Sequence, residues 1–164
     1  MRWLSEDEQQ TWRAYLAATR RVFDELDREL QRDAGMPHGY YVVLVALSES
    51  PGRSLRMTDL AAATGSSRSR LSHAVARLEE AGWVERRPCP SDRRGSLAVL
   101  TDAGTATLAA AAPGHVEGVR RHLFDRLTPA QVCQLRELSE AVLGDTDAGK
   151  GSPAGRGVGH RVDG

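Results

Sequence analysis

Arginine side chains crowd one stretch of this 164-residue chain, WVERRPCPSDRRGSLAVLT at Trp83–Thr101. Four of them lie in or beside a turn rich in Pro, Asp and Gly: Arg86, Arg87, Arg93 and Arg94. Because a guanidinium group forks onto phosphate and fits a narrow minor groove, this stretch has the chemistry to bind a polyanion. Asp92 could hold the Arg94 guanidinium in the extended rotamer that a groove requires. The alternative is that Asp92 only caps the turn.

A second group of polar residues follows a helical period just before this stretch. Apolar residues recur on one face of residues 67–81: Leu71, Ala74, Val75 and Leu78. Polar and basic residues fill the rest of the segment: Ser67, Arg68, Ser69, Arg70, Ser72, His73 and Arg77. Arginine can donate two hydrogen bonds to one guanine, and serine can contact a phosphate or a base. These side chains therefore suit the major groove of DNA. The alternative is an ordinary solvated face.

A helix–turn–helix would hold these side chains in place. Thr58 is expected to cap a short first helix over Asp59–Thr64. Gly65 is placed for the tight turn, after which Ser66 or Ser67 caps the second helix. In this motif the second helix lies in the major groove, with its N-terminal residues at the base edges.

A β-hairpin is expected to follow the second helix. The runs Trp83–Arg87 and Ser96–Leu100 are β-prone and flank the arginine-rich turn, which predicts a wing over residues 84–100. Leu55 could lie in a short strand that pairs with this wing. The fold class predicted is therefore mainly α with a small β-hairpin wing, a winged helix over about residues 40–100.

Helices are also expected before this winged helix. Ser5-Glu6-Asp7-Glu8 is a capping box that opens a long amphipathic helix over about residues 5–33. Tyr40–Ser48 is interpreted as a buried helix, although its Tyr-Tyr-Val-Val start favours a strand. An apolar stripe as long as that of the first helix needs a partner along its whole length, which predicts an obligate dimer.

The C-terminal part of the chain is predicted to be helical up to Gly144. Thr101 caps an Ala-rich segment that Pro113 either kinks or divides into two helices. Thr128 caps a last helix with proline at its first position and glutamine at its third. Residues 1–144 are therefore expected to form a single domain. Residues 145–164 are Gly-rich with few apolar residues and are expected to form a flexible tail.

Charge is distributed unevenly along a chain whose formal net charge is zero. Residues 1–52 hold six arginines against nine acids, a net of −3, whereas residues 53–94 hold nine arginines against five acids, a net of +4. The positive charge therefore coincides with the predicted winged helix, as a nucleic-acid partner requires. A solvated basic face is the alternative, and because lysine occurs only at Lys150, a single arginine is weak evidence in this chain.

Other classes of protein are disfavoured. Two distant cysteines, Cys89 and Cys133, form no disulfide framework, and with no signal-peptide core and no apolar run of about 18 residues we expect a cytoplasmic protein. His115 and His122 are too far apart to chelate as an i, i+4 pair, and no catalytic set has supporting context. We expect no metal, no cofactor and no enzymatic activity. A winged-helix module for protein–protein assembly is the main alternative to a DNA-binding regulator, and salt-dependent DNA binding would separate the two.

The order of these motifs resembles the MarR (multiple antibiotic resistance regulator) family of bacterial transcription factors. The resemblance covers about residues 5–144 and rests on three motifs: the Leu-Glu-x-x-Gly junction at Leu78–Gly82, the Asp-x-Arg of the wing at Asp92–Arg94, and the Leu-Thr-x-x-Gly at Leu100–Gly104. It implies a homodimer built from helices at about 5–33 and 101–144. It also implies a pseudo-palindromic DNA operator, bound usually as a repressor.

The chain departs from the family in two ways. His73 stands where many relatives have arginine in the recognition helix, so we expect a different base preference. Some relatives sense peroxides through a cysteine near the start of the first helix, and this helix has none. Cys133 is interpreted as a small core or interface residue, whereas Cys89 sits among arginines that could lower its pKa.

The family resemblance further implies a small aromatic or phenolic effector. Aromatic and polar-tipped side chains on the first two helices could line its pocket: Trp12, Tyr15, His38, Tyr40 and Tyr41. Equally, the same residues could simply pack the junction of these helices.

Overall fold

The structure, a computed structural model, describes residues 1–89 and 92–144. The expected flexible tail, residues 145–164, lies outside this description, as do the side chains of residues 92–94. The described residues divide into two compact units, Met1–Arg126 and a second that begins at Leu127. The single domain expected for residues 1–144 stays a prediction.

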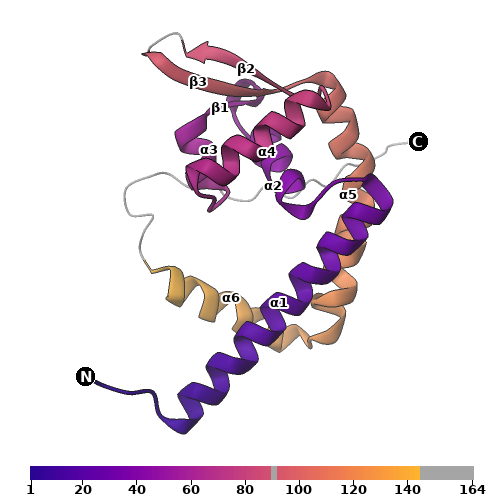
Figure 1. The fold of residues 1–164 in the computed structure, drawn as a ribbon. Coiled ribbons are helices and arrows are strands. Elements are labelled where there is room, and N and C mark those ends of the chain that lie inside the picture. Colours follow the sequence, from indigo (N-terminus) through magenta and orange to yellow (C-terminus); the bar gives the residue numbers. More distant parts are fainter. Residues whose placement is uncertain (90–91, 145–164) are drawn as a thin grey trace. The chain divides into compact units, whose positions relative to one another are not determined.

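The first helix, α1 (Glu6–Ala34), is as long as the sequence predicts. Its capping box is present: the Ser5 hydroxyl accepts from the Glu8 backbone N–H at 3.2 Å, and the Ser5 N–H donates to the Glu8 carboxylate at 2.7 Å. It ends at Gly35, which adopts the left-handed conformation at φ 64°. Figure 1 shows the C-terminal half of α1 lying beside α5 (Asp102–His122).

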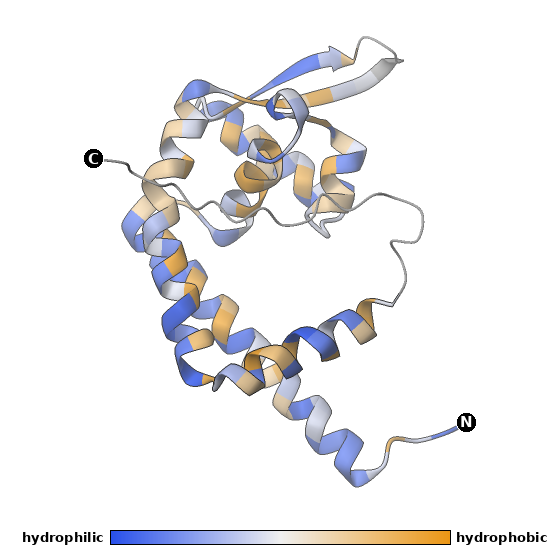
Figure 2. Ribbon diagram, turned by 180° about the vertical axis from the view of Figure 1, so that it is seen from behind, coloured by the Kyte–Doolittle hydropathy of each residue, from blue (hydrophilic) through white to orange (hydrophobic). Residues whose placement is uncertain are grey.

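The second helix, α2 (His38–Ser48), confirms the buried helix predicted there. Leu44 and Leu47 are completely buried, as is Met36 before the helix. The local strand preference of Tyr-Tyr-Val-Val is overridden because neighbouring elements cover the segment on nearly every side. The core around α2 is almost entirely aliphatic, as Figure 2 shows by the hydrophobic colouring of its centre.

The helix–turn–helix is formed by α3 (Met57–Ala63) and α4 (Arg68–Glu80). The expected start of α3 was wrong: Thr58 is not its cap but lies inside the first turn, and Arg56 occupies the N-cap position. The reason is that Arg56 ends strand β1 (Ser54–Arg56), so its extended backbone already marks the helix boundary. Before β1, a single 3₁₀ turn, η1, spans Pro51–Arg53.

The wing is an antiparallel hairpin of β2 (Val84–Cys89) and β3 (Asp92–Leu100), drawn at the top of Figure 1. β1 pairs with the other side of β3, so the sheet order is β1-β3-β2 and the predicted short strand at Leu55 is confirmed. β3 begins at Asp92 rather than at Ser96, which corrects the predicted strand. The pairing continues past Pro88 through an irregular register before Cys89. Proline is tolerated there because β2 is an edge strand.

The C-terminal segments are helical. α5 is one helix that contains Pro113, which decides between the two alternatives left open by the sequence. A 3₁₀ turn, η2 (Phe124–Arg126), follows it. In the second unit, α6 (Pro129–Leu143) begins with the predicted capping box, in which the Thr128 hydroxyl accepts from the Gln131 N–H at 3.3 Å.

The joint between β3 and α5 generates the first prediction. A Cβ at Gly104 would overlap the Trp83 carbonyl oxygen and lie 2.7 Å from Leu100 Cδ1. We expect Gly104→Ala to lower the free energy of unfolding by about 1–3 kcal/mol, as overpacking does. Gly114→Ala in the same helix meets nothing within 4 Å, so it should stabilise by about 0.5–1 kcal/mol through helix propensity. Urea titrations of both variants test this, and equal midpoints would contradict the tight joint.

Candidate nucleic-acid interface

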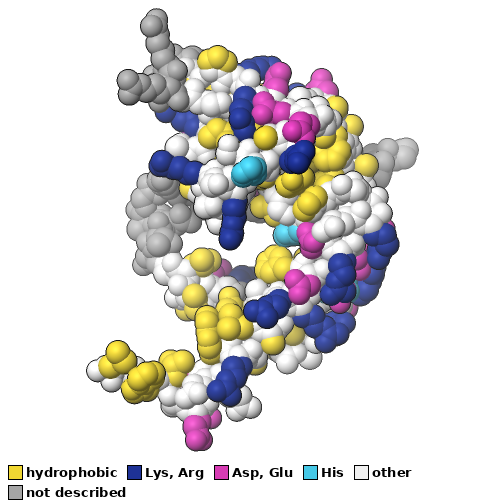
Figure 3. Space-filling model, viewed as in Figure 1, with side chains coloured by type: hydrophobic (Ala, Val, Ile, Leu, Met, Phe, Trp, Pro, Cys, Tyr) yellow, Lys and Arg dark blue, Asp and Glu magenta, His cyan; other side chains and the backbone are white. Residues whose placement is uncertain are grey.

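The recognition helix α4 separates its residues into two faces. Leu71, Val75 and Leu78 are at most 1% exposed and belong to the core. The polar side chains named from the sequence are all exposed: Ser67, Arg68, Ser69, Arg70, Ser72, His73 and Arg77. Figure 3 shows basic side chains and a histidine over this face. The core therefore fixes the rotation of α4 and turns its polar face to solvent.

The N-terminus of α4 carries positive charge from two exposed arginines, Arg68 and Arg70. Ser67 caps the helix by accepting from the Arg70 N–H at 3.3 Å, so of the two caps considered it is Ser67 that serves. Among the residues whose side chains are described, 1–89 and 95–144, no carboxylate forms an ion pair with the guanidinium groups of Arg68 and Arg70. Arg77 differs because Glu80 holds it at 2.6 Å, which raises its pKa. Free guanidinium groups at a helix N-terminus reinforce the positive end of its dipole, which favours an anionic partner.

The wing arginines fall into different environments. Arg87 is exposed and pairs with Glu85 on the same strand. Arg86 is only about one-third exposed and bonds to α4. The backbone of Asp92, Arg93 and Arg94 belongs to β3, so these residues continue the strand rather than lie in a loop. Their side chains lie outside the described residues, and their role as DNA contacts stays a prediction.

Two hollows join α4 to its neighbours. One, of about 280 Å³, lies between α3, α4 and the wing and is lined by Met57, Thr58, Arg68, Leu71, Ser72, Arg86 and Ser96. The other, of about 370 Å³, is lined by Ser69, Ser72, His73, Ala76 and Arg86. Ser72 and Arg86 line both, so the polar face of α4 continues without interruption to the base of the wing.

The comparisons with known proteins agree with this geometry. A MarR family model matches residues 34–95. A similar solved structure is that of Sco3205 from Streptomyces coelicolor, a MarR family transcriptional regulator crystallised in complex with DNA. It is 55% identical to this chain and superposes with a TM-score of 0.84. The match covers 91% of this chain and 93% of the Sco3205 chain. The chain belongs to the MarR family. It is a winged-helix transcriptional regulator and not an enzyme, which confirms the resemblance and the fold class.

Two further relatives support the assignment. AbsC, a MarR family transcriptional regulator from Streptomyces coelicolor, is 44% identical, with 87% of this chain and 96% of AbsC covered and a TM-score of 0.80. The transcriptional repressor MprA of Escherichia coli K12 is 27% identical over 113 residues, which are 69% of this chain. This match spans 64% of MprA, just under two thirds of that relative's length.

The five residues suggested as an effector pocket of this MarR-family chain do not form one cluster. Trp12 and Tyr15 stack on each other at 6.1 Å and are more than half exposed. Phe23, eleven residues further along α1 than Trp12, contacts the His38 ring at 5.4 Å. At about 1.5 Å of rise per residue, Trp12 therefore lies roughly 16 Å along the helix from this contact. The structure keeps the Trp12–Tyr15 pair apart from His38.

Two of the five residues, His38 and Tyr41, instead meet His115 at the junction of α1, α2 and α5. The His115 ring lies 4.2 Å from Tyr41 and 5.5 Å from His38. Burial lowers the pKa of both histidines, and the neighbouring His38 lowers that of His115 further. Burial also raises the pKa of Tyr41. Tyr40 is half-buried on the same helix. His115 and Phe23 could not be found from the sequence, because each approaches His38 only through tertiary packing: Phe23 where α1 meets α2, and His115 where α5 meets α2.

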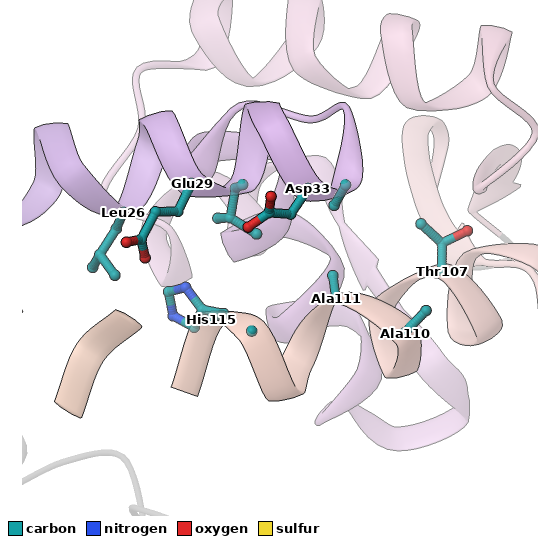
Figure 4. Close-up of a pocket in the computed structure, with 10 residues that line it drawn as sticks. Leu26, Glu29, Asp33, Thr107, Ala110, Ala111 and His115 are labelled. Carbon is teal, nitrogen blue, oxygen red and sulfur yellow. The ribbon is translucent and has the colours of Figure 1, made fainter. Parts of the chain in front are cut away.

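This junction borders a cavity of about 280 Å³ between α1 and α5 (Figure 4). In the close-up, the carboxylates of Glu29 and Asp33 and the ring of His115 lie toward the gap between the two helices. Apolar side chains of both helices complete the lining, among them Leu26, Leu30, Ala110 and Ala111. Glu29 is held in place by Arg121 at 2.8 Å and His122 at 2.9 Å. The cavity is therefore an apolar slot with a few fixed polar tips.

The cysteines lie in different settings. Cys89 is 5% exposed at the end of β2. Cys133 is exposed on α6, so it is not a core residue of the second unit, and its alternative place in an interface stays a prediction. The described residues hold no group of three His, Cys, Asp or Glu side chains that could bind a metal ion. None of the described helices combines the length and apolar character that crossing a membrane demands.

Proposed function

We propose that this chain is a sequence-specific DNA-binding regulator that acts as a homodimeric repressor on a pseudo-palindromic operator. The observation that carries the proposal is the exposed face of α4, where Arg68 and Arg70 at the capped N-terminus have no carboxylate partner among the side chains that the structure describes. Base edges in the major groove are read from this end of a recognition helix. Arg68 would fork onto guanine, and Ser69, Ser72 and His73 would contact bases or phosphates. The DNA-bound structure of Sco3205 is consistent with this assignment.

The homodimer is supported by apolar surface that one chain leaves uncovered. In α1, Trp12, Tyr15, Leu16 and Phe23 are each at least 40% exposed, although they recur at helical spacing. In α6, Leu138 and Val142 are 66% and 85% exposed. A second copy of the chain would cover both stripes. It would place two recognition helices about 34–36 Å apart, in successive major grooves.

Selection from a random DNA library with the purified protein tests the proposal. We expect an inverted repeat whose half-sites are centred about 10 base pairs apart, and light scattering of the complex should give two chains per duplex. A protein that is monomeric at micromolar concentration, or that selects no sequence, would contradict it. Salt-independent capture of a protein partner instead would favour a winged helix that serves protein assembly.

Arginines in the two DNA-facing elements should respond differently to removal. Arg94→Ala should weaken binding to all sequences and lower the slope of log K against log salt by about 0.9, because a wing arginine acts on phosphates and groove potential. Arg68→Ala should relax the preference at particular base pairs by about 1–3 kcal/mol. Fluorescence anisotropy on matched and mismatched duplexes separates the two. Unchanged affinity of Arg94→Ala at physiological salt would reject its assignment.

We further propose that a small aromatic effector of phenolic or weakly acidic character binds the slot between α1 and α5. His38, Tyr41 and the slot-lining His115 would form its aromatic edge, and Trp12 and Tyr15 would have no part in it. A ligand changes DNA binding only if it prefers one spacing of the recognition helices over another. The slot lies where α1 meets α5, so a ligand bound there would favour one arrangement of these two helices and with it one spacing of the recognition helices.

A pair of alanines in α5 provides the test of this effector. Ala110 lines the slot and Ala109 does not, and both are exposed. Phenolic and carboxylated aromatic compounds should lower DNA affinity for the wild type and for Ala109→Phe but not for Ala110→Phe, whose ring fills the slot. Anisotropy titrations with each compound measure this. If no compound in the panel shifts the wild-type affinity, the effector proposal fails while the DNA-binding proposal stands.

A further inference from the structure

Arg86 differs from Arg87 in what its side chain contacts. Its Nη2 donates to the Ser72 carbonyl oxygen at 3.0 Å, and its Nε lies 3.2 Å from Glu79 Oε2. The backbone N–H of Arg86 donates to the other oxygen of the same carboxylate at 3.0 Å. The Glu79 carboxylate therefore binds both the main chain and the side chain of Arg86. Arg86 in turn donates a hydrogen bond to the main chain of α4.

Strand alternation explains why the two neighbouring arginines differ. Successive side chains of a strand point to opposite faces, so Arg86 shares the face of Val84, which is 2% exposed, whereas Arg87 lies on the other face. Across the sheet, Arg86 pairs with Ala98, which is fully buried. Arg86 therefore lies on the side of the wing that meets α4, and Arg87 on the side that meets solvent.

The contact points on α4 suit a mechanical link. Ser72 and Glu79 are seven residues apart and thus lie on the same face, about two helical turns from each other. Because β2 is an edge strand, some of its N–H groups have no partner in the sheet, and Glu79 satisfies the one at Arg86. To reach a phosphate, Arg86 would have to abandon the Ser72 carbonyl and leave the Glu79 carboxylate unpaired beside DNA.

We propose that Glu79 and Arg86 form a clamp that sets the angle between the wing and the recognition helix, and that Arg86 governs DNA specificity through this position rather than by contacting DNA. The inference rests on the proposed DNA-binding function. A fixed angle means that the major-groove contacts of α4 and the contacts of the wing are made together. A wing that pivots freely would still bind phosphates, so the clamp acts on discrimination between sequences more than on affinity for DNA as such.

The DNA-binding test compares Arg86→Gln, Glu79→Ala and the matched control Arg87→Gln on two duplexes, the one selected by the wild type and a scrambled one. Arg87→Gln should lower the salt slope by about 0.9 on both duplexes, as loss of one phosphate contact does. Arg86→Gln should leave that slope within about 0.3 of the wild type and lower the ratio of specific to non-specific affinity roughly tenfold. Glu79→Ala should lower the same ratio. If Arg86 contacted DNA directly, Glu79→Ala would free it and raise specific affinity.

Hydrogen exchange of the DNA-free protein gives a second readout that needs no DNA binding. Alanine favours helix, so Glu79→Ala leaves α4 intact while it removes the acceptor of the Arg86 N–H. Exchange at the β2 amides should rise about tenfold in Glu79→Ala and stay unchanged in Arg87→Gln. The clamp is refuted if exchange is unchanged in Glu79→Ala, or if Arg86→Gln lowers the salt slope as much as Arg87→Gln does. If the wild type does not discriminate between the two duplexes, only the proposed function is refuted. Hydrogen exchange of the DNA-free protein then still tests the clamp.

Discussion

Burial of one face of α4 is the constraint on which the rest of the structure depends. Leu71, Val75 and Leu78 are packed into the same aliphatic core as α2 and the inner face of the sheet. Burial of each of these side chains contributes about 1.5–3 kcal/mol to the stability of the fold. Their burial therefore fixes the rotation of the helix about its axis. Every polar residue between them must then face outward. The surface that carries Arg68 and Arg70 is thus a consequence of core packing and not an independent feature.

The zero net charge of the chain conceals how this surface is charged. Three acids of α4 and the wing are already paired with arginines: Glu80 with Arg77, Glu79 with Arg86 and Glu85 with Arg87. Their arginine partners lie toward the C-terminal end of α4 and on the wing. At the N-terminal end, the guanidinium groups of Arg68 and Arg70 have no carboxylate partner in the described part of the chain. Positive potential is therefore concentrated at the end of the helix where its dipole is also positive. Placement of ion pairs, more than the count of charges, decides what the surface can bind.

The sequence predicted those features that local chemistry determines. The caps at Ser5, Thr101 and Thr128 follow from side chains that bond their own helix start, and all three are present. The early start of β3 could not be predicted, because a Pro-, Asp- and Gly-rich stretch reads as turn until its partner strand is known. The five candidate effector residues do not gather in one place within a single chain, because the length of α1 separates Trp12 from His38. Strand alternation alone, in contrast, could have distinguished Arg86 from Arg87.

The joint after the wing links the two functional parts of the first unit. The Thr101 N–H donates to the Trp83 carbonyl at 3.0 Å, and the Thr101 hydroxyl donates to the Gly82 carbonyl at 2.8 Å while it accepts from the Gly104 N–H at 2.9 Å. One residue therefore ties the end of α4, the start of the wing and the start of α5. The absence of a Cβ at Gly104 lets these backbones touch. At its other end, α5 is bonded to α1 through Glu29 and Arg121. Because both ends of α5 are anchored, we expect a movement of α5 to reorient the winged helix rather than to be absorbed at the joint.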